Sequence, residues 1–174
     1  MGKVFRKLQK KIIGCYDFFN VKKYMKKYTC YLQKCGVHIE EYTSVGYIHP
    51  SAYLDPMDYS LFTIGHNVTI SKEVMMLVHD FSIWNGMIAL DPENEKKRFK
   101  FMKPIKIGNN CFVGARSFIL PGTTIGDNVI IGAASVVKGN IPPNTVWAGN
   151  PAKQICTIEE FAKRHIDKQD FIQI

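Results

Sequence analysis

The chain has 174 residues, of which 46% are hydrophobic, and a formal net charge of +8. This length allows one domain with a sizeable core, and no apolar run approaches the roughly 20 residues that a membrane-spanning helix needs. The basic start of the sequence is not followed by an apolar segment with a cleavage site, so we expect a cytoplasmic protein. The five cysteines form no paired motif and have no histidine at ligand spacing, so neither a disulfide framework nor a metal site is expected.

The positive charge is concentrated in a leader, residues 1–36. Residues 1–35 hold ten Lys or Arg and one acid, whereas the other 139 residues hold 13 Lys or Arg and 14 acids. Apolar residues recur in the leader at helical spacing, which predicts one or two short helices broken near Gly14 or Asn20. Two interpretations stay open: the apolar side docks on this or a neighbouring subunit, or the leader makes peripheral contact with the inner face of a membrane. Nucleic-acid binding is not expected.

The body, residues 37–156, carries a six-residue repeat that is regular from Ile107 to Val137. An aliphatic residue opens each hexad, glycine often follows, and a small or β-branched residue lies four places later. The same frame is present from Ile64 to Met76, whereas it slips earlier, where Asp55 to Ser60 has turn chemistry. This spacing predicts short stacked strands that turn a corner every six residues, in a parallel β-helix of triangular cross-section.

Two further segments depart from the repeat. Residues 82–104 form an excursion with a Trp, an Asn-Gly, an Asp-Pro and a charged stretch, and an insertion of this length is more often functional than accidental. Residues 157–174 follow the repeat, and Thr157 with Glu160 forms a capping box. We therefore expect a C-terminal helix that covers the open end of the coil.

The motifs Ile64 to Ile70, Leu77 to Asp80, Ile107 to Asn110 and Gly149 to Lys153 together resemble the hexapeptide-repeat acyltransferases. Within that family they resemble the sugar O-acetyltransferase branch of the galactoside and maltose acetyltransferases. The resemblance implies an all-β fold, a left-handed parallel β-helix, and a homotrimer with sites between subunits. It also implies acetyl-CoA as the co-substrate and no metal.

His79 is the candidate catalytic residue. It lies in the hexad slot that Asn67, Asn110 and Asn128 occupy in other coils, so we expect it to project from a corner beside the excursion. Acetyl transfer to a hydroxyl requires a base that works near neutrality, which suits imidazole. An acid from the preceding irregular stretch, Asp55 or Asp58, is expected to orient the ring; we assign Asp55 to this role and Asp58 to substrate binding.

The resemblance also implies positions that contact the CoA. Phe112, Ala115 and Ala133 match positions that face the pantetheine arm, and Lys138 and Lys153 match positions that bind phosphates. Lys138 comes one residue early relative to the galactoside enzyme pattern, and solvated surface charge is an equal alternative for both lysines. Trp84 and the cations between Lys96 and Lys103 are expected to line the acceptor site or to contact the phosphates of an activated donor, with plain solvation as the alternative.

The expected function is acetyl-CoA-dependent O-acetylation of a sugar hydroxyl, with a sugar or lipid-linked sugar of a surface polysaccharide as acceptor. An amino-sugar N-acetyltransferase or a serine acetyltransferase-like enzyme would use the same base and stays an alternative. A non-catalytic β-helix scaffold is a third, and it predicts no affinity for CoA.

Overall fold

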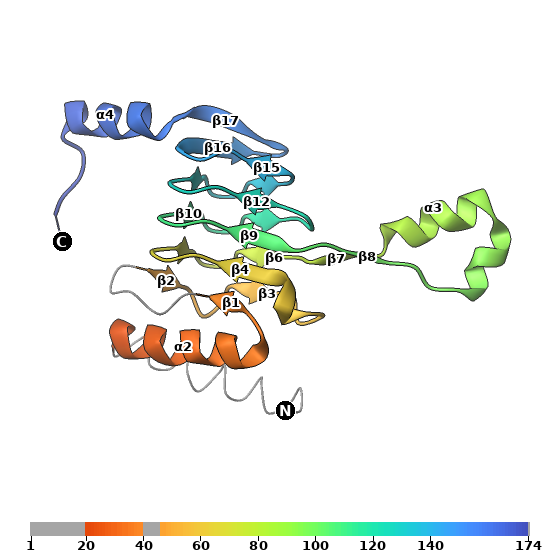
Figure 1. The fold of residues 1–174 in the computed structure, drawn as a ribbon. Helices are drawn as coiled ribbons and strands as arrows, with labels where there is room; N and C mark the ends of the chain where they lie inside the picture. Colours follow the sequence, from red (N-terminus) through yellow and green to blue (C-terminus); the bar gives the residue numbers. More distant parts are fainter. Residues whose placement is uncertain (1–19, 40–45, 174) are drawn as a thin grey trace.

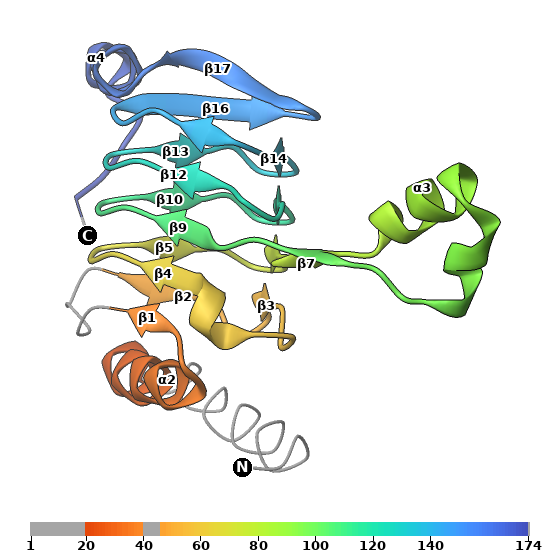
Figure 2. The ribbon, with the colours of Figure 1, turned by 45° about the vertical axis from the view of Figure 1, so that its right-hand side comes forward.

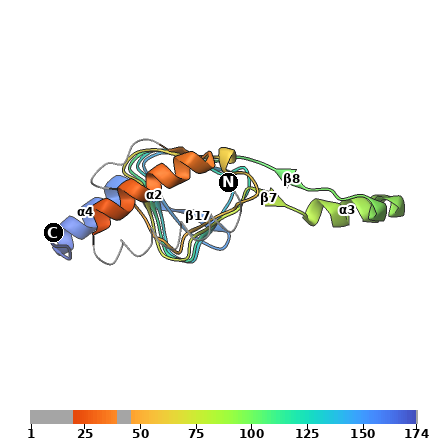
Figure 3. The same ribbon diagram turned by 90° about the horizontal axis from the view of Figure 1, so that it is seen from below.

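The computed structural model describes residues 20–39 and 46–173 of the chain. Most of these residues form a prism of stacked triangular coils (Figures 1 and 2). The chain passes through three parallel sheets in turn, which we name A, B and C, and the three corners between them are the A–B, B–C and C–A corners. Figure 3 shows the triangular outline along the axis.

Each sheet is a ladder of very short strands. Sheet A contains β1 (His38–Ile39), β4 (Phe62–Ile64), β9 (Ile105–Ile107), β12 (Thr124–Ile125) and β15 (Asn140–Ile141). Sheet B contains β2 (Tyr47–Ile48), β5 (Thr69–Ile70), β10 (Phe112–Val113), β13 (Ile130–Ile131), β16 (Thr145–Gly149) and the antiparallel β17 (Ala152–Thr157). Sheet C contains β3 (Tyr53–Leu54), β6 (Met75–Met76), β11 (Phe118–Ile119) and β14 (Val136–Val137).

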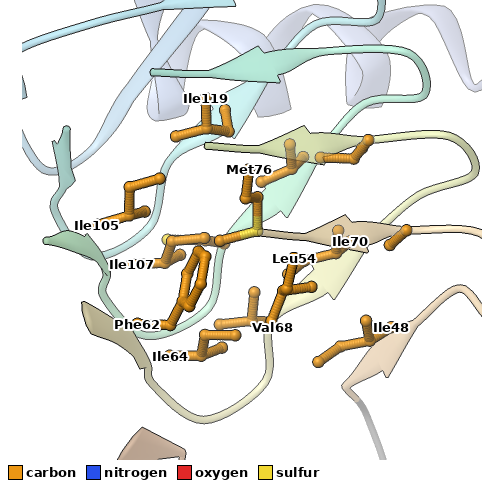
Figure 4. Packing of buried hydrophobic residues seen from close by; sticks show 14 of the residues in the cluster. Ile48, Leu54, Phe62, Ile64, Val68, Ile70, Met76, Ile105, Ile107 and Ile119 are labelled. Carbon is orange, nitrogen blue, oxygen red and sulfur yellow. The ribbon is translucent and has the colours of Figure 1, made fainter. Parts of the chain in front are cut away.

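The residue that opens each hexad points into the prism. In successive coils Ile64 pairs with Ile107 and Ile107 with Ile125, and all three are at most 2% exposed. Figure 4 shows how Ile64 and Ile107 fill the narrow interior together with Phe62 and Met76. The last hexad departs from the spacing, because Ile141, only four residues after Val137, takes the inward position of β15.

The base of the prism is covered by α2 (Val21–Cys35), which begins after the N-cap Asn20. Its aromatic and aliphatic side is buried against the first coil, and the Tyr24 hydroxyl donates to the carbonyl of Ile48 at 2.6 Å. The N–H of Ile48 donates to the sulfur of Met25 at 3.2 Å. The helix therefore satisfies the backbone groups of Ile48 at the edge of β2, and its apolar side docks on this subunit. The expected helix before Gly14 lies outside the described residues.

The excursion begins earlier than expected and is largely structured. The chain leaves the C–A corner at β7 (His79–Asp80), forms α3 (Ser82–Leu90) and the 3-10 helix η2 (Pro92–Lys96), and returns through β8 (Phe101–Met102). β7 and β8 pair antiparallel as a stalk that holds α3 and η2 away from the prism (Figures 1 and 3). We call residues 79–104 the arm.

The upper end of the prism is closed differently from the expectation. β17, which the hexad pattern does not predict, folds back on β16 and covers its edge. α4 (Ile158–Lys168) follows with the expected capping box, in which Thr157 and Glu160 exchange side-chain bonds with each other's backbone N–H. None of its residues is fully buried, so the hairpin and not the helix is the main cover of this end.

Candidate active site

The C–A corner gathers polar side chains from several coils. The irregular turn after β3 contributes Asp55, the root of the arm contributes His79, and the turn after β14 contributes Lys138. In the register of sheet C, the ends of β3, β6, β11 and β14 are stacked in that order, so residues far apart in the sequence meet along one corner.

Asp55 and His79 form a hydrogen-bonded pair at this corner. Asp55 Oδ2 contacts His79 Nδ1 and also accepts the N–H of Val78 at 3.2 Å, while Asp55 Oδ1 accepts the N–H of Met57 at 3.0 Å. The Asp55 side chain is 2% exposed and that of His79 is 22% exposed. A buried carboxylate with both oxygens engaged is held in one orientation, and it fixes the imidazole ring beside it.

The pairing determines which ring nitrogen of His79 is available for proton transfer. An ionised carboxylate only accepts hydrogen bonds, so Nδ1 carries the proton in the neutral ring and Nε2 has the free lone pair. Among the described residues, no group makes a hydrogen bond to Nε2. The corner therefore presents a partly exposed, oriented base.

The backbone of His79 differs from that of its expected counterparts. Asn67, Asn110 and Asn128 have φ between 52° and 55°, which is the left-handed region, whereas His79 is not among the described residues with positive φ. It lies at the corner, as expected, but its backbone is extended in β7. The reason is that the chain leaves the coil at this point instead of turning into the next strand.

The surroundings of the pair are aromatic and charged. The Phe81 ring lies edge-on to the imidazole at a centroid distance of 5.3 Å. Asp58 accepts from the N–H of Ser60 at 2.9 Å and from its hydroxyl at 2.6 Å, and these bonds hold the pKa of Asp58 below its usual value. Asp58 therefore caps η1 (Tyr59–Leu61), and of the two expected acids only Asp55 contacts the imidazole in the described contacts.

Three of the five expected CoA positions lie along the B–C corner. The N–H of Ala134 donates to the carbonyl of Ala115 at 2.9 Å, which stacks the turn holding Ala133 on the turn holding Ala115. In the coil above, Trp147 of β16 pairs with Ile131. The residue after it, Ala148, pairs with Lys153 on β17. Ala115, Ala133 and Lys153 therefore form one column beside sheet C, and it is the tertiary stacking that brings them together.

The other two expected CoA positions lie apart from this column. Phe112 is 43% exposed on the outer face of β10 in sheet B. Lys138 is at the C–A corner, where it contributes, after the Ser82 hydrogen bonds, to keeping the pKa of Asp80 below its usual value. Lys138 is thus on the same corner as His79, on the opposite side of sheet C from Ala115 and Ala133.

Trp84 lies in the outer part of the arm. Its indole N–H donates to the carbonyl of Asn94 at 3.1 Å, and the Asn94 amide donates to the carbonyl of Met87 at 2.9 Å. The guanidinium of Arg98 lies 5.4 Å from the centre of its ring. These contacts hold α3 and η2 together, and they place Trp84 farther along the arm than Phe81, an aromatic residue that the sequence motifs do not single out. The position of Phe81 two residues after His79 is the signal that would have found it.

Known proteins that resemble this chain are acetyltransferases. Residues 104–138 match the model of the hexapeptide repeat of succinyl-transferase. Galactoside O-acetyltransferase of Escherichia coli K12 is 40% identical over 111 residues, which are 64% of this chain and 51% of that protein. The expected resemblance to the hexapeptide-repeat acyltransferases is confirmed. The chain spans about half the length of the curated relatives it matches.

Solved structures agree with the fold. A maltose O-acetyltransferase from Clostridium difficile 630 has a TM-score of 0.59 at 25% identity, covering 89% of this chain and 85% of that one. A galactoside acetyltransferase in complex with coenzyme A has a TM-score of 0.56 at 27% identity, covering 94% and 86%. The left-handed parallel β-helix expected from the sequence is thereby confirmed. Within the described residues, no group of three His, Cys, Asp or Glu side chains is arranged to hold a metal ion.

Proposed function

We propose that this protein is an acetyl-CoA-dependent acetyltransferase that modifies a hydroxyl group of a sugar, with His79 as general base and Asp55 as the residue that orients it. The observation that carries the proposal is the His79–Asp55 pair at the root of the arm. The similarity to galactoside O-acetyltransferase over 111 residues, and the shared fold with two sugar acetyltransferases, support the same reaction class.

The geometry suits direct transfer without an acyl-enzyme. Nε2 of His79 takes the proton of the acceptor hydroxyl as its oxygen attacks the thioester carbonyl carbon. The tetrahedral intermediate then collapses, the carbon–sulfur bond breaks, and the imidazolium returns the proton to the CoA thiolate. Asp55 keeps Nδ1 protonated throughout, so that Nε2 is the nitrogen that exchanges the proton.

We place the CoA along sheet C, between the expected CoA residues of its two corners. The column of Ala115 and Ala133 has no bulky side chain, and Lys153 lies at its upper end. A thin pantetheine arm would follow this column, with Lys153 beside a phosphate and Phe112 at the edge. Lys138, on the opposite corner, would approach the reacting end of the same ligand. The galactoside acetyltransferase of similar fold was solved in complex with coenzyme A, which supports this choice of ligand.

We further propose that the protein is a homotrimer whose active sites lie between subunits. Sheet C supports this, because the outward residues of its paired strands are apolar. They align as Tyr53, Met75, Phe118 and Val136, and Tyr53 and Phe118 are 40% and 39% exposed. Light scattering on the purified protein tests the assembly.

Among the described residues, no helix is long and apolar enough to span a membrane.

The decisive experiment compares two histidines that each bind an aspartate. His79→Ala should lose activity by about 10²- to 10⁴-fold, the usual contribution of a general base, while circular dichroism stays unchanged. His165 also pairs with an acid, Asp170, at 2.6 Å, but it lies on the exposed C-terminal segment, so His165→Ala should retain activity.

The assay should use acetyl-CoA with a panel of sugar hydroxyl, amino-sugar and serine acceptors. Product with hydroxyl acceptors is expected, whereas product with amines alone would favour the N-acetyltransferase alternative. Near-normal turnover of His79→Ala would refute the proposed mechanism. Absence of CoA binding by calorimetry would instead favour a scaffold.

A further inference from the structure

The returning side of the arm, residues 97–103, is strongly cationic. Four of its seven residues are Lys or Arg, none is acidic, and Phe99 and Phe101 alternate with the cations. The acids of the arm's tip, Asp91, Glu93 and Glu95, lie on the preceding segment, and Lys96 is already paired with Glu93 at 2.6 Å. The cations of residues 97–103 make no ion pair with a carboxylate among the described residues.

Two of these cations, Lys100 and Lys103, stand at the root of the arm. The Lys100 ammonium lies 6.0 Å from the centre of the Phe81 ring, the ring that contacts the imidazole. Lys103 donates its backbone N–H to the carbonyl of Val78 at 2.9 Å, and the preceding residue, Met102, pairs with His79 across the stalk. Both lysine side chains are exposed.

The two lysines approach the root from opposite sides. Lys100 is near Asp58, in the coil below the arm, because its charge contributes to lowering the pKa of that carboxyl after the Ser60 hydrogen bonds. The side-chain stem of Lys103 lies against Gly122, in the coil above, where an added Cβ would meet Cδ of Lys103 at 3.0 Å. The Lys103 ammonium lies 5.5 Å from the centre of the Phe101 ring. Lys100 is thus on the imidazole side of the stalk, and Lys103 is beside Phe101.

The carboxylates at this corner are occupied by other donors. Asp55 binds His79 and two backbone N–H groups, Asp58 binds Ser60, and Asp80 accepts the N–H of Ser82 at 2.7 Å. Lys138 adds a third cation from the coil above. The corner thus has an excess of solvent-facing positive charge beside the base, which favours an acceptor that carries negative charge.

Resting on the proposed function, we propose that Lys100 and Lys103 bind the diphosphate of the acceptor from the two sides of the root of the arm, so that the substrate is a diphosphate-linked sugar. Each phosphate of a sugar diphosphate carries one negative charge and two non-bridging oxygens, and each ammonium group offers three donors to them. The diphosphate would sit at the root of the arm while the sugar hydroxyl meets Nε2 of His79. The same chemistry is found in nucleotide-linked and in lipid-linked sugar diphosphates.

The first experiment measures binding and does not depend on turnover. Inorganic pyrophosphate is titrated calorimetrically into the protein saturated with CoA, so that the CoA phosphate positions are filled. The double variant Lys100→Gln/Lys103→Gln should bind pyrophosphate at least about tenfold more weakly, because each substitution removes a charge-assisted contact. The matched control, Lys163→Gln/Lys168→Gln on α4, removes the same charge far from the arm and should bind as the unmodified protein does. Equal affinity of the two double variants would overturn the proposal.

The second experiment uses acceptors that share one sugar but carry a diphosphate, a carboxylate or no anion. We expect the lysine double variant to raise KM for the diphosphate acceptor by about tenfold with kcat and the KM of acetyl-CoA unchanged, and to leave the free sugar unaffected. An equal effect on the carboxylate acceptor would overturn the choice of phosphate. A nucleoside-diphosphate sugar and a polyprenyl-diphosphate sugar, assayed side by side, identify the source. Pyrophosphate binding that depends on both lysines, without acetyl transfer, would reject the proposed function and leave the phosphate site standing.

Discussion

The A–B and C–A corners of the prism are built from the same six-residue spacing but have opposite contents. At the A–B corner, Asn67, Asn110, Asn128 and Asn144 all have positive φ, and the side-chain amides of the first three each donate to the side-chain carbonyl of the next Asn at 2.7–2.8 Å. This ladder satisfies its own polar groups. At the C–A corner the turns differ from coil to coil, the arm interrupts them, and Asp55 and His79 satisfy each other. The regular corner satisfies its own polar groups, whereas the irregular corner presents a partly exposed histidine.

Among the substitutions that test this difference between the corners, Asp55→Asn should have the largest effect on activity. The two oxygens of Asp55 accept three N–H groups, and an amide provides only one accepting oxygen, so either His79 or a backbone N–H loses its partner. We expect kcat/KM to fall on the order of 100-fold because the ring loses its fixed tautomer.

Nitrogen-15 NMR of the imidazole supplies the readout that a purely structural defect would not change. It should show Nδ1–H in the unmodified protein and a mixture of tautomers in the variant. Asp170→Asn, which removes the partner of His165, is the control. An unchanged tautomer with full activity would contradict the role of Asp55.

Gly108→Ala should break the A–B corner. An added Cβ at Gly108 would meet the backbone carbon of Gly126, in the next coil, at 2.8 Å, and backbone atoms in a stacked coil have little room to move. We expect a loss of about 1–3 kcal/mol in the free energy of unfolding, measured by denaturant titration.

The matched variant at the C–A corner is Gly139→Ala. Gly139 has φ +87° but no atom within 4 Å of the added Cβ, so only backbone strain opposes the change. That cost is about 1 kcal/mol. A larger loss at Gly139 than at Gly108 would show that the C–A corner is the tighter one.

Asn110→Ala tests the ladder itself. It removes two side-chain hydrogen bonds, one from Asn67 and one to Asn128, and puts alanine at φ 54°. A decrease of about 1–2 kcal/mol in unfolding free energy is expected, with acetyl transfer unchanged because the ladder lies at the other corner. Loss of activity at full stability would mean that the two corners are coupled.

The smallest effect concerns cysteine reactivity. Burial raises the pKa of the Cys111 thiol, whose sulfur donates to the carbonyls of Asn109 and Gly126 inside the A–B corner, whereas Cys30 is exposed on α2. Iodoacetamide labelling followed by mass spectrometry at neutral pH should modify Cys30 well before Cys111. In Gly108→Ala the difference between the labelling rates of Cys30 and Cys111 should become smaller, because that substitution loosens the A–B corner. An unaltered ratio of the two rates would show that the corner keeps its packing.

The sequence by itself determined the coil, because a side chain that repeats every six residues has one inward position per strand, and burial of Ile107, Val113 and Ile119 follows from that spacing alone. It also located the departures from the coil, including the arm and the capping box at Thr157. These features are local, since each depends on residues within one or two turns of the chain.

Only the tertiary structure decided which residues meet. Asp55 and His79 are 24 positions apart, and the choice between Asp55 and Asp58 depended on the direction of an irregular turn that no periodicity describes. The placement of Lys138 on the His79 corner, the cover formed by β17 and the docking of α2 were likewise set by stacking between coils. Contacts of this kind depend on how separate coils lie over one another, and that arrangement is fixed by packing and edge hydrogen bonds rather than by local spacing.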